Sequence, residues 1–124
     1  MRKPSLKSLK AKLDKTFSIW VRSQGAVNGI NACVTCGTVL PIERLQCSHY
    51  ISRVHLATRF DPRNSHPCCY ACNVLRRGNM SAYALYMLKT YGQATLEELE
   101  RLKHTSVKFT REHYQRLIDE YSKW

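Results

Sequence analysis

Two pairs of cysteines constrain this chain more than any other feature of its sequence. Each pair has the spacing Cys-x-x-Cys, with Cys33 and Cys36 separated from Cys69 and Cys72 by residues 37–68. Two thiolates in a tight turn form half of a tetrahedral Zn²⁺ site, so two such turns complete one closed site. We therefore expect a structural zinc held by all four cysteines, in preference to free core cysteines or a redox pair. The linker exceeds the ~15–20 residues of a common zinc ribbon, which predicts a sizeable looped-out segment.

Two further cysteines, Cys47 and Cys68, fall outside these pairs, and we interpret both as small buried hydrophobic residues. Six cysteines would also suit a disulfide framework in an exported chain, but the opening MRKPSLKSLK lacks the apolar stretch of a signal peptide. The apolar runs are far shorter than the ~20 residues of a membrane span. We accordingly expect a soluble, cytoplasmic protein with no membrane partner, in which reduced thiols bind metal.

The net charge of +11 indicates a polyanionic partner. The positive charge is concentrated in residues 1–24 and in the cysteine-rich residues 33–78, whereas residues 79–124 are nearly neutral. Clustered Lys and Arg side chains displace condensed counterions from phosphate chains. This distribution favours nucleic acid as the partner over a merely solvated basic surface.

The whole chain, residues 1–124, is expected to form one α+β domain. Apolar residues at steps of three and four predict an amphipathic basic helix within residues 1–25, with the candidate DNA-binding residues Lys7 and Lys10 on its polar face. Residues 33–79 are rich in turn-forming residues, which predicts short strands, loops and a short helix around the second cysteine pair.

Residues 80–124 return to a helical pattern of apolar and aromatic residues. Thr95 and Glu98 have the spacing of a capping box, and Thr110 can cap a final helix. We expect three helices here that close the core or, alternatively, supply the interface of a homodimer.

The segment between the cysteine pairs, CSHYISRVHLATRFDPRNSHPC, is unusually polar for a linker. His49 lies between the pairs, Asn64 precedes the second pair and Asn73 follows it directly. Hydrolysis of a phosphodiester near neutral pH needs a base, and neutral imidazole has a suitable pKa of ~6.5. It also needs a divalent cation held by oxygen or nitrogen ligands in a partly open site. These residues together suggest a one-metal phosphodiesterase.

These motifs resemble the NinG (Rap) recombination proteins of lambdoid phages, a family of HNH-like, ββα-metal nucleases that act on branched DNA. The Cys-x-x-Cys-Asn ending is also similar to recombination endonuclease VII, a Holliday-junction resolvase. The resemblance covers nearly the whole chain, through CVTCG at 33–37, CSHYISRVHLATRFDPRNSH at 47–66, CYACN at 69–73, GN at 78–79 and VKFTREHYQRLIDEY at 107–121.

The resemblance implies a zinc-stapled ββα-metal (HNH, His-Me finger) core flanked by the basic helix and the C-terminal helices. It makes His49 the general base, at the end of the first strand of this core. It makes Asn64 the residue that braces the loop holding the base, and Asn73 a ligand of a catalytic Mg²⁺ or Mn²⁺. Many relatives carry Asp or His as a second metal ligand where this chain has Ser48. Further candidates for that cation are His66, Asp61 and the more distant His55.

Three arginines flank the proposed site and are expected to clamp the scissile DNA strand, namely Arg53, Arg59 and Arg63. The predicted function is a structure-selective endonuclease that hydrolyses phosphodiesters in Holliday junctions and D-loops. Two alternatives stay open: a non-catalytic, zinc-containing DNA-binding module, and an HNH nuclease without branch selectivity. The joint presence of a base and two asparagines at nuclease spacing favours cleavage, because binding alone does not require them.

Overall fold

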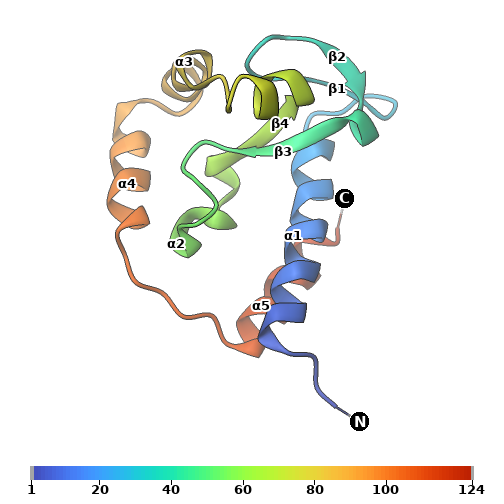
Figure 1. Ribbon diagram of the computed structural model, residues 1–124, viewed down its shortest axis with the longest axis vertical. Coiled ribbons are helices and arrows are strands. Elements are labelled where there is room, and N and C mark those ends of the chain that lie inside the picture. Colours follow the sequence, from blue (N-terminus) through green and yellow to red (C-terminus); the bar gives the residue numbers. More distant parts are fainter. Residues whose placement is uncertain (1, 124) are drawn as a thin grey trace.

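The computed structural model describes residues 2–123 and shows a mixed α+β arrangement with two small antiparallel sheets (Figure 1). This agrees with the α+β class expected from the sequence. The elements in chain order are α1 (Leu6–Ser23), β1 (Ile30–Ala32), β2 (Val39–Pro41), η1 (Ile42–Arg44), β3 (Leu45–His49), α2 (Leu56–Arg59), η2 (Pro62–Asn64), β4 (Ser65–Cys69), η3 (Ala71–Leu75), α3 (Met80–Tyr91), α4 (Gln93–Lys103) and α5 (Arg111–Tyr121).

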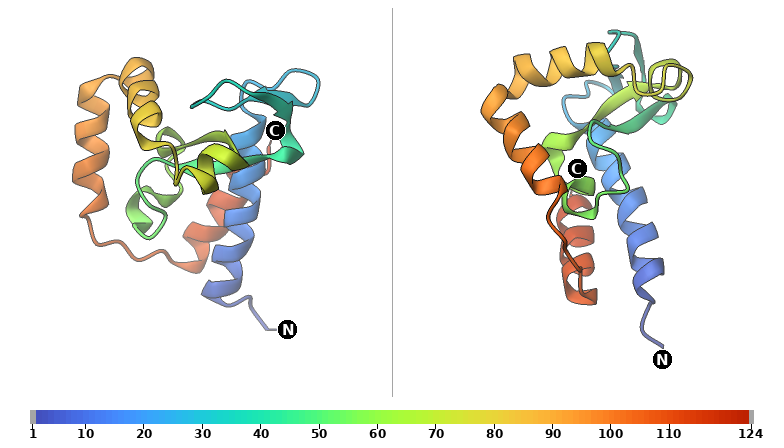
Figure 2. Two further views of the ribbon diagram at one scale, coloured as in Figure 1. Left: turned by 45° about the horizontal axis from the view of Figure 1, so that its top comes forward. Right: turned by 60° about the vertical axis from the view of Figure 1, so that its left-hand side comes forward.

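The helix predicted within residues 1–25 is present as α1. Ser5 caps the N-terminus of α1, because its side chain accepts a hydrogen bond from the Ser8 N–H at 3.0 Å and so satisfies an unpaired amide of the first turn. The apolar stripe of α1 packs against α5, and the two helices lie side by side (Figure 2). The buried side chains of this cluster include Leu9, Leu13, Phe17 and Val21 of α1 and Tyr114, Ile118 and Tyr121 of α5.

β3 and β4 form an antiparallel pair in which His49, the last residue of β3, lies opposite Ser65, the first residue of β4. Side chains alternate between the two faces of a strand. Cys47 packs against the α1–α5 cluster, whereas Cys68 belongs to a second cluster formed with residues of α3 and α4. The pair of strands is followed directly by the short turn η3. The candidate site residues His49, Asn64 and Asn73 lie on or next to β3, β4 and η3.

The C-terminal residues form the three expected helices, α3, α4 and α5. Thr110 caps α5 as predicted, since its hydroxyl accepts from the His113 N–H at 3.1 Å. The capping box predicted at Thr95 is wrong, because α4 already begins at Gln93 after Gly92. Gly92 has a φ of 85°, which lets the chain end α3 and start α4 within one residue.

None of the helices in residues 2–123 has the length and apolar character that a membrane crossing requires.

Candidate functional site

The four predicted zinc ligands lie together. Their sulfur atoms are all within 4.8 Å of one another, and the Sγ atoms of Cys36 and Cys69 are 3.7 Å apart. Tetrahedral coordination with Zn–S bonds of ~2.3 Å places sulfur atoms roughly 3.8 Å apart. Cys33, Cys69 and Cys72 are buried, and Cys36 is exposed. The four-cysteine cluster therefore has the donor atoms and the spacing to hold a metal such as zinc.

Hydrogen-bond donors surround the sulfur atoms of this cluster. Arg76 Nη1 donates to Cys72 Sγ at 3.3 Å, and Asn79 Nδ2 lies 3.5 Å from the same atom. Burial raises the pKa of Cys33, but the Thr35 hydroxyl and nearby backbone amides outweigh it and lower this pKa to about 6. Such outer contacts favour the thiolate form that binds metal.

The two remaining cysteines lie outside the cluster. Cys68 is fully buried and Cys47 is partly buried against α1 and its neighbours. Burial raises the pKa of each thiol to about 12. Both therefore stay protonated near neutral pH, as small hydrophobic residues do in a core.

His49 ends β3, where its imidazole is held by the backbone of α2. Its Nε2 atom is 2.9 Å from the carbonyl oxygen of Arg59. The centroid of its ring lies 6.4 Å from the centroid of the Phe17 ring of α1. A carbonyl oxygen can only accept, so Nε2 carries the proton and Nδ1 is the nitrogen with a free lone pair. Burial is the main cause that lowers the pKa of His49. The imidazole is thus neutral near pH 7 and able to take up a proton at Nδ1.

Asn64 is completely buried and ties together the loop that follows His49. Its Oδ1 accepts from the Ile51 N–H at 2.8 Å, and its Nδ2 donates to the carbonyls of Ile51 at 3.0 Å and Thr58 at 3.3 Å. The amide thereby links both ends of residues 50–64. This geometry suits the bracing role that the resemblance implied for Asn64.

Asn73 lies in η3, directly after Cys72, and contacts the beginning of β3. Its Nδ2 donates to Gln46 Oε1 at 2.7 Å. Gln46 precedes His49 by three residues, a rise of ~10 Å along a strand, and the alternation of side chains places the two on opposite faces. The hydrogen bonds of Asn73 and His49 therefore go to different partners, Gln46 and the Arg59 carbonyl.

His66 was a candidate ligand for a second cation, but the structure shows a hydrogen-bonded core histidine. Its Nδ1 is 2.9 Å from the Tyr83 hydroxyl and its Nε2 is 2.6 Å from the Tyr91 hydroxyl. Tyr83 donates its proton to the Ser48 carbonyl at 2.7 Å, so Nδ1 donates to Tyr83 and Nε2 accepts from Tyr91. Burial lowers the pKa of His66 to about 4. Both ring nitrogens are occupied, which leaves no lone pair for a metal in this conformation.

Asp61 has a similarly structural position. Its Oδ1 accepts from the Arg63 N–H at 2.9 Å and so caps η2. The side chain of Arg63 pairs with Asp61 at 2.8 Å and also with Glu98 of α4. His55 precedes α2 and borders a cavity of about 500 Å³ beside α4. Neither Asp61 nor His55 belongs to a group of metal-ligating side chains in the described part of the chain.

The three arginines predicted to clamp DNA are ion-paired to different degrees. Arg59 donates to both carboxylate oxygens of Asp14 at 2.9 and 2.6 Å, and only 11% of its side chain is exposed. Arg53 is 3.3 Å from the same carboxylate but is 60% exposed. The charges of Arg59 and Arg63 are thus largely neutralised within the fold, whereas the side chain of Arg53 stays largely exposed to solvent.

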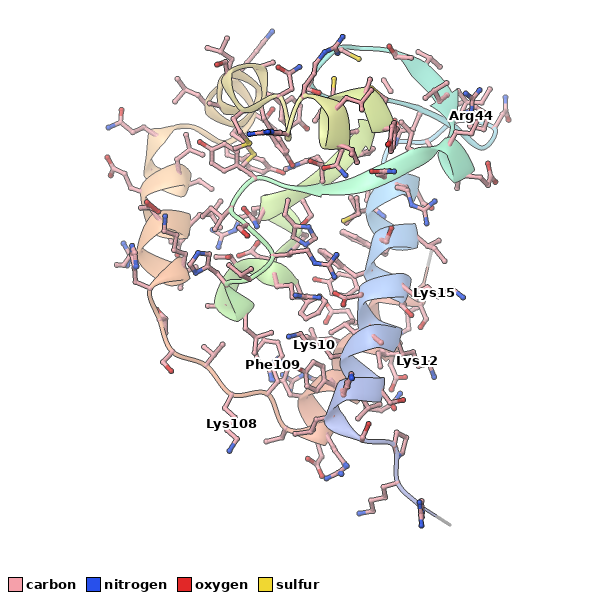
Figure 3. All side chains as sticks on the ribbon, in the orientation of Figure 1. Lys10, Lys12, Lys15, Arg44, Lys108 and Phe109 are labelled. Carbon is pink, nitrogen blue, oxygen red and sulfur yellow. The ribbon has the colours of Figure 1, made fainter. Side chains whose placement is uncertain are left out.

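The basic helix presents lysines to the outside of the molecule. Lys7 is exposed and Lys10 is half-buried. Figure 3 shows Lys12 and Lys15 on the side of α1 that points away from the rest of the fold, with Arg44 further along. This face carries the positive charge that the sequence predicted for the helix.

Several residues of the site do not stand out in the sequence. They are Asp14, Thr35, Gln46, Arg76 and Asn79. Their hydrogen-bond partners lie far away in the sequence or in an irregular turn, so the spacing of residues along the sequence does not indicate these contacts. Asp14 alone could have been singled out from the sequence, because it is the one acidic residue in residues 1–24, which also contain seven Lys and Arg residues.

A family model described as "Bacteriophage Lambda NinG protein" matches residues 1–124. The chain belongs to the NinG family. Among NinG relatives, protein ninG of Salmonella phage P22 and that of Escherichia phage lambda are each 30% identical over 116 residues, which is 86% of this chain. Protein ninG of Escherichia phage 933W is 32% identical over 95 residues, which is 69% of this chain.

The alignments cover 56% of the P22 and lambda proteins and 47% of the 933W protein. The chain therefore spans about half the length of these curated NinG relatives. No solved structure matches it. The predicted NinG membership is confirmed, whereas the similarity to HNH nucleases and to endonuclease VII stays a prediction.

Proposed function

We propose that this NinG-family chain is a metal-dependent DNA endonuclease that hydrolyses phosphodiesters in branched recombination intermediates, with His49 as the general base. The observation that carries the proposal is the contact between His49 Nε2 and the Arg59 carbonyl. It fixes the tautomer in which Nδ1 can accept a proton, and burial keeps the ring neutral.

In this proposal, Nδ1 of His49 takes a proton from a water molecule. The resulting hydroxide attacks the phosphorus atom, and the bond between phosphorus and one bridging oxygen breaks. The leaving oxygen then takes a proton from solvent. Asn64 contributes by holding the loop at Ile51 and Thr58, which keeps the Arg59 carbonyl near His49.

The residues around Asn73 suit a divalent cation such as Mg²⁺ or Mn²⁺. The amide oxygen of Asn73 is a hard donor and is the ligand that we propose for the cation, while its Nδ2 donates to Gln46 Oε1 at 2.7 Å. Mg²⁺ commonly takes few protein ligands and fills its shell with water and phosphate oxygens, so a sparse donor set fits an open site. When bound, such a cation would stabilise the negative charge that develops on the phosphate.

The charge distribution supports DNA as the substrate. The chain carries a net charge of +11, and α1 exposes Lys7, Lys12 and Lys15. The preference for branched DNA rests on the resemblance to the family and not on a particular residue. A homodimer, which is also proposed, would match the symmetry of a four-way junction.

Cleavage of a labelled four-way junction beside a matched linear duplex tests the proposal, in Mg²⁺, Mn²⁺ and EDTA. We expect metal-dependent cutting of the junction, and a loss of about 10²–10⁴-fold in rate for His49→Ala with zinc content and DNA affinity retained. His104→Ala, at an exposed histidine after α4, is the matched control. Equal cutting of both substrates would indicate a nuclease without branch selectivity. Tight binding without cutting in any metal would leave a zinc-containing DNA-binding module.

A further inference from the structure

Asp14 is the one acidic residue within the basic segment 1–24, and it lies in the middle of α1. Its side chain is 26% exposed, and its two carboxylate oxygens accept from Arg59 at 2.9 and 2.6 Å. It also lies 3.3 Å from Arg53. A single carboxylate on a lysine-rich helix thus holds two arginines of the segment that follows His49.

Arg59 joins this ion pair to His49 through its own backbone. Its carbonyl oxygen is the acceptor for His49 Nε2 at 2.9 Å, and its Nη1 donates to the Arg53 carbonyl at 2.9 Å. Two parallel charge-assisted hydrogen bonds between a guanidinium and a carboxylate are strong and directional. The guanidinium and the carbonyl belong to one residue, Arg59, at the end of the short helix α2. Holding the guanidinium on Asp14 therefore restricts the movement of the carbonyl oxygen that His49 contacts.

α1 contacts the imidazole by a second route as well. Phe17 follows Asp14 by three residues, so the two share a face of the helix. The Phe17 ring lies 6.4 Å from the His49 ring between centroids. The charged groups that face His49 are Asp14 from α1, Arg53 from the loop and Arg59 from α2.

We propose that Asp14 is a positioning residue, which fixes the Arg59 carbonyl through the Asp14–Arg59 ion pair and thereby holds His49 with its proton on Nε2. The inference rests on the proposed role of His49 as the base. It assigns Arg59 to the support of the base instead of to the DNA strand. It also accounts for an acidic residue on a helix that otherwise presents positive charge to DNA.

The test measures the tautomer of His49 by ¹⁵N long-range correlation NMR, together with single-turnover cleavage. We expect the Nε2-protonated form in the natural chain, and a mixture of tautomers with cleavage slower by about 10- to 100-fold in Asp14→Asn. Asp119→Asn makes the same change at an exposed acid on α5 and should alter neither readout. Zinc content and DNA affinity report whether each variant is folded.

Substitutions at Arg59 provide a second, independent readout. Arg59→Lys keeps the charge but loses the paired hydrogen bonds, so it should retain more of the native tautomer than Arg59→Met does. An unchanged tautomer in folded Asp14→Asn and Arg59→Met would overturn the positioning role. If His49→Ala retained cleavage, the proposed function would fail, and the NMR result would still decide whether Asp14 positions the ring.

Discussion

At the scale of single residues, the two histidines of the β3–β4 pair have different surroundings. His49 has one nitrogen held by a carbonyl, whereas His66 has both nitrogens bound to tyrosine hydroxyls. The sequence could single out both as candidates because each lies between the cysteine pairs. It could not separate them, since Tyr83 and Tyr91 come from a helix further along the chain.

The buried His66 makes stability depend on pH. An unfolded histidine titrates near ~6.5, while burial lowers the pKa of His66 to about 4 in the native state. Between these values the unfolded state binds more protons, so stability is lost as the pH falls through this range. We expect the free energy of unfolding to fall by up to about 3 kcal/mol between pH 7 and pH 4, measured by urea denaturation.

His66→Gln should flatten this dependence, because it removes the titrating group. His104→Gln, at an exposed position, should leave it unchanged. Identical slopes for His66→Gln and the natural chain would show that another group causes the acid sensitivity.

At the scale of elements, the sequence predicted the helices with strong apolar periodicity and the four-cysteine cluster. α1 and α5 follow their apolar stripes, and Thr110 caps α5. The start of α4 was missed because Gly92, and not a capping side chain, ends the preceding helix. The ion pair between α1 and α2 depends on the tertiary fold, so no local pattern could indicate it.

The cysteine cluster ties β1–β2 to β4 and η3, so metal removal should loosen these elements together. Cys69→Ser should lose one equivalent of bound zinc and the cooperative unfolding transition, measured by metal analysis and circular dichroism. Cys47→Ala, outside the cluster, should keep the metal. Full zinc content in Cys69→Ser would contradict the assignment of this cluster.

At the scale of the whole molecule, the charge is uneven: α1 and the central segment are strongly basic and the C-terminal helices are nearly neutral. The positions of the charged residues in the sequence already give this uneven distribution. Only the structure shows which basic side chains stay exposed, because Arg59 and Arg63 pair with carboxylates while Lys12 and Lys15 lie on the outer side of α1 (Figure 3).

The lysines of α1 should control the salt dependence of DNA binding. Each phosphate contact contributes about 0.9 to the slope of log affinity against log salt concentration. The double variant Lys7→Ala, Lys10→Ala should reduce the magnitude of this negative slope by up to about 2, measured by fluorescence anisotropy. Lys103→Ala removes a lysine that pairs with Glu100 and should have little effect. An unchanged slope in the double variant would place the DNA elsewhere.

Chemical rescue of His49→Ala by imidazole in the junction-cleavage assay tests most directly whether His49 is the general base. We predict that the variant binds the junction but scarcely cuts it, and that added imidazole restores cutting in proportion to its neutral fraction as the pH is varied. Cleavage by His49→Ala at the rate of the natural chain, without imidazole, would contradict the assignment of His49 as the general base.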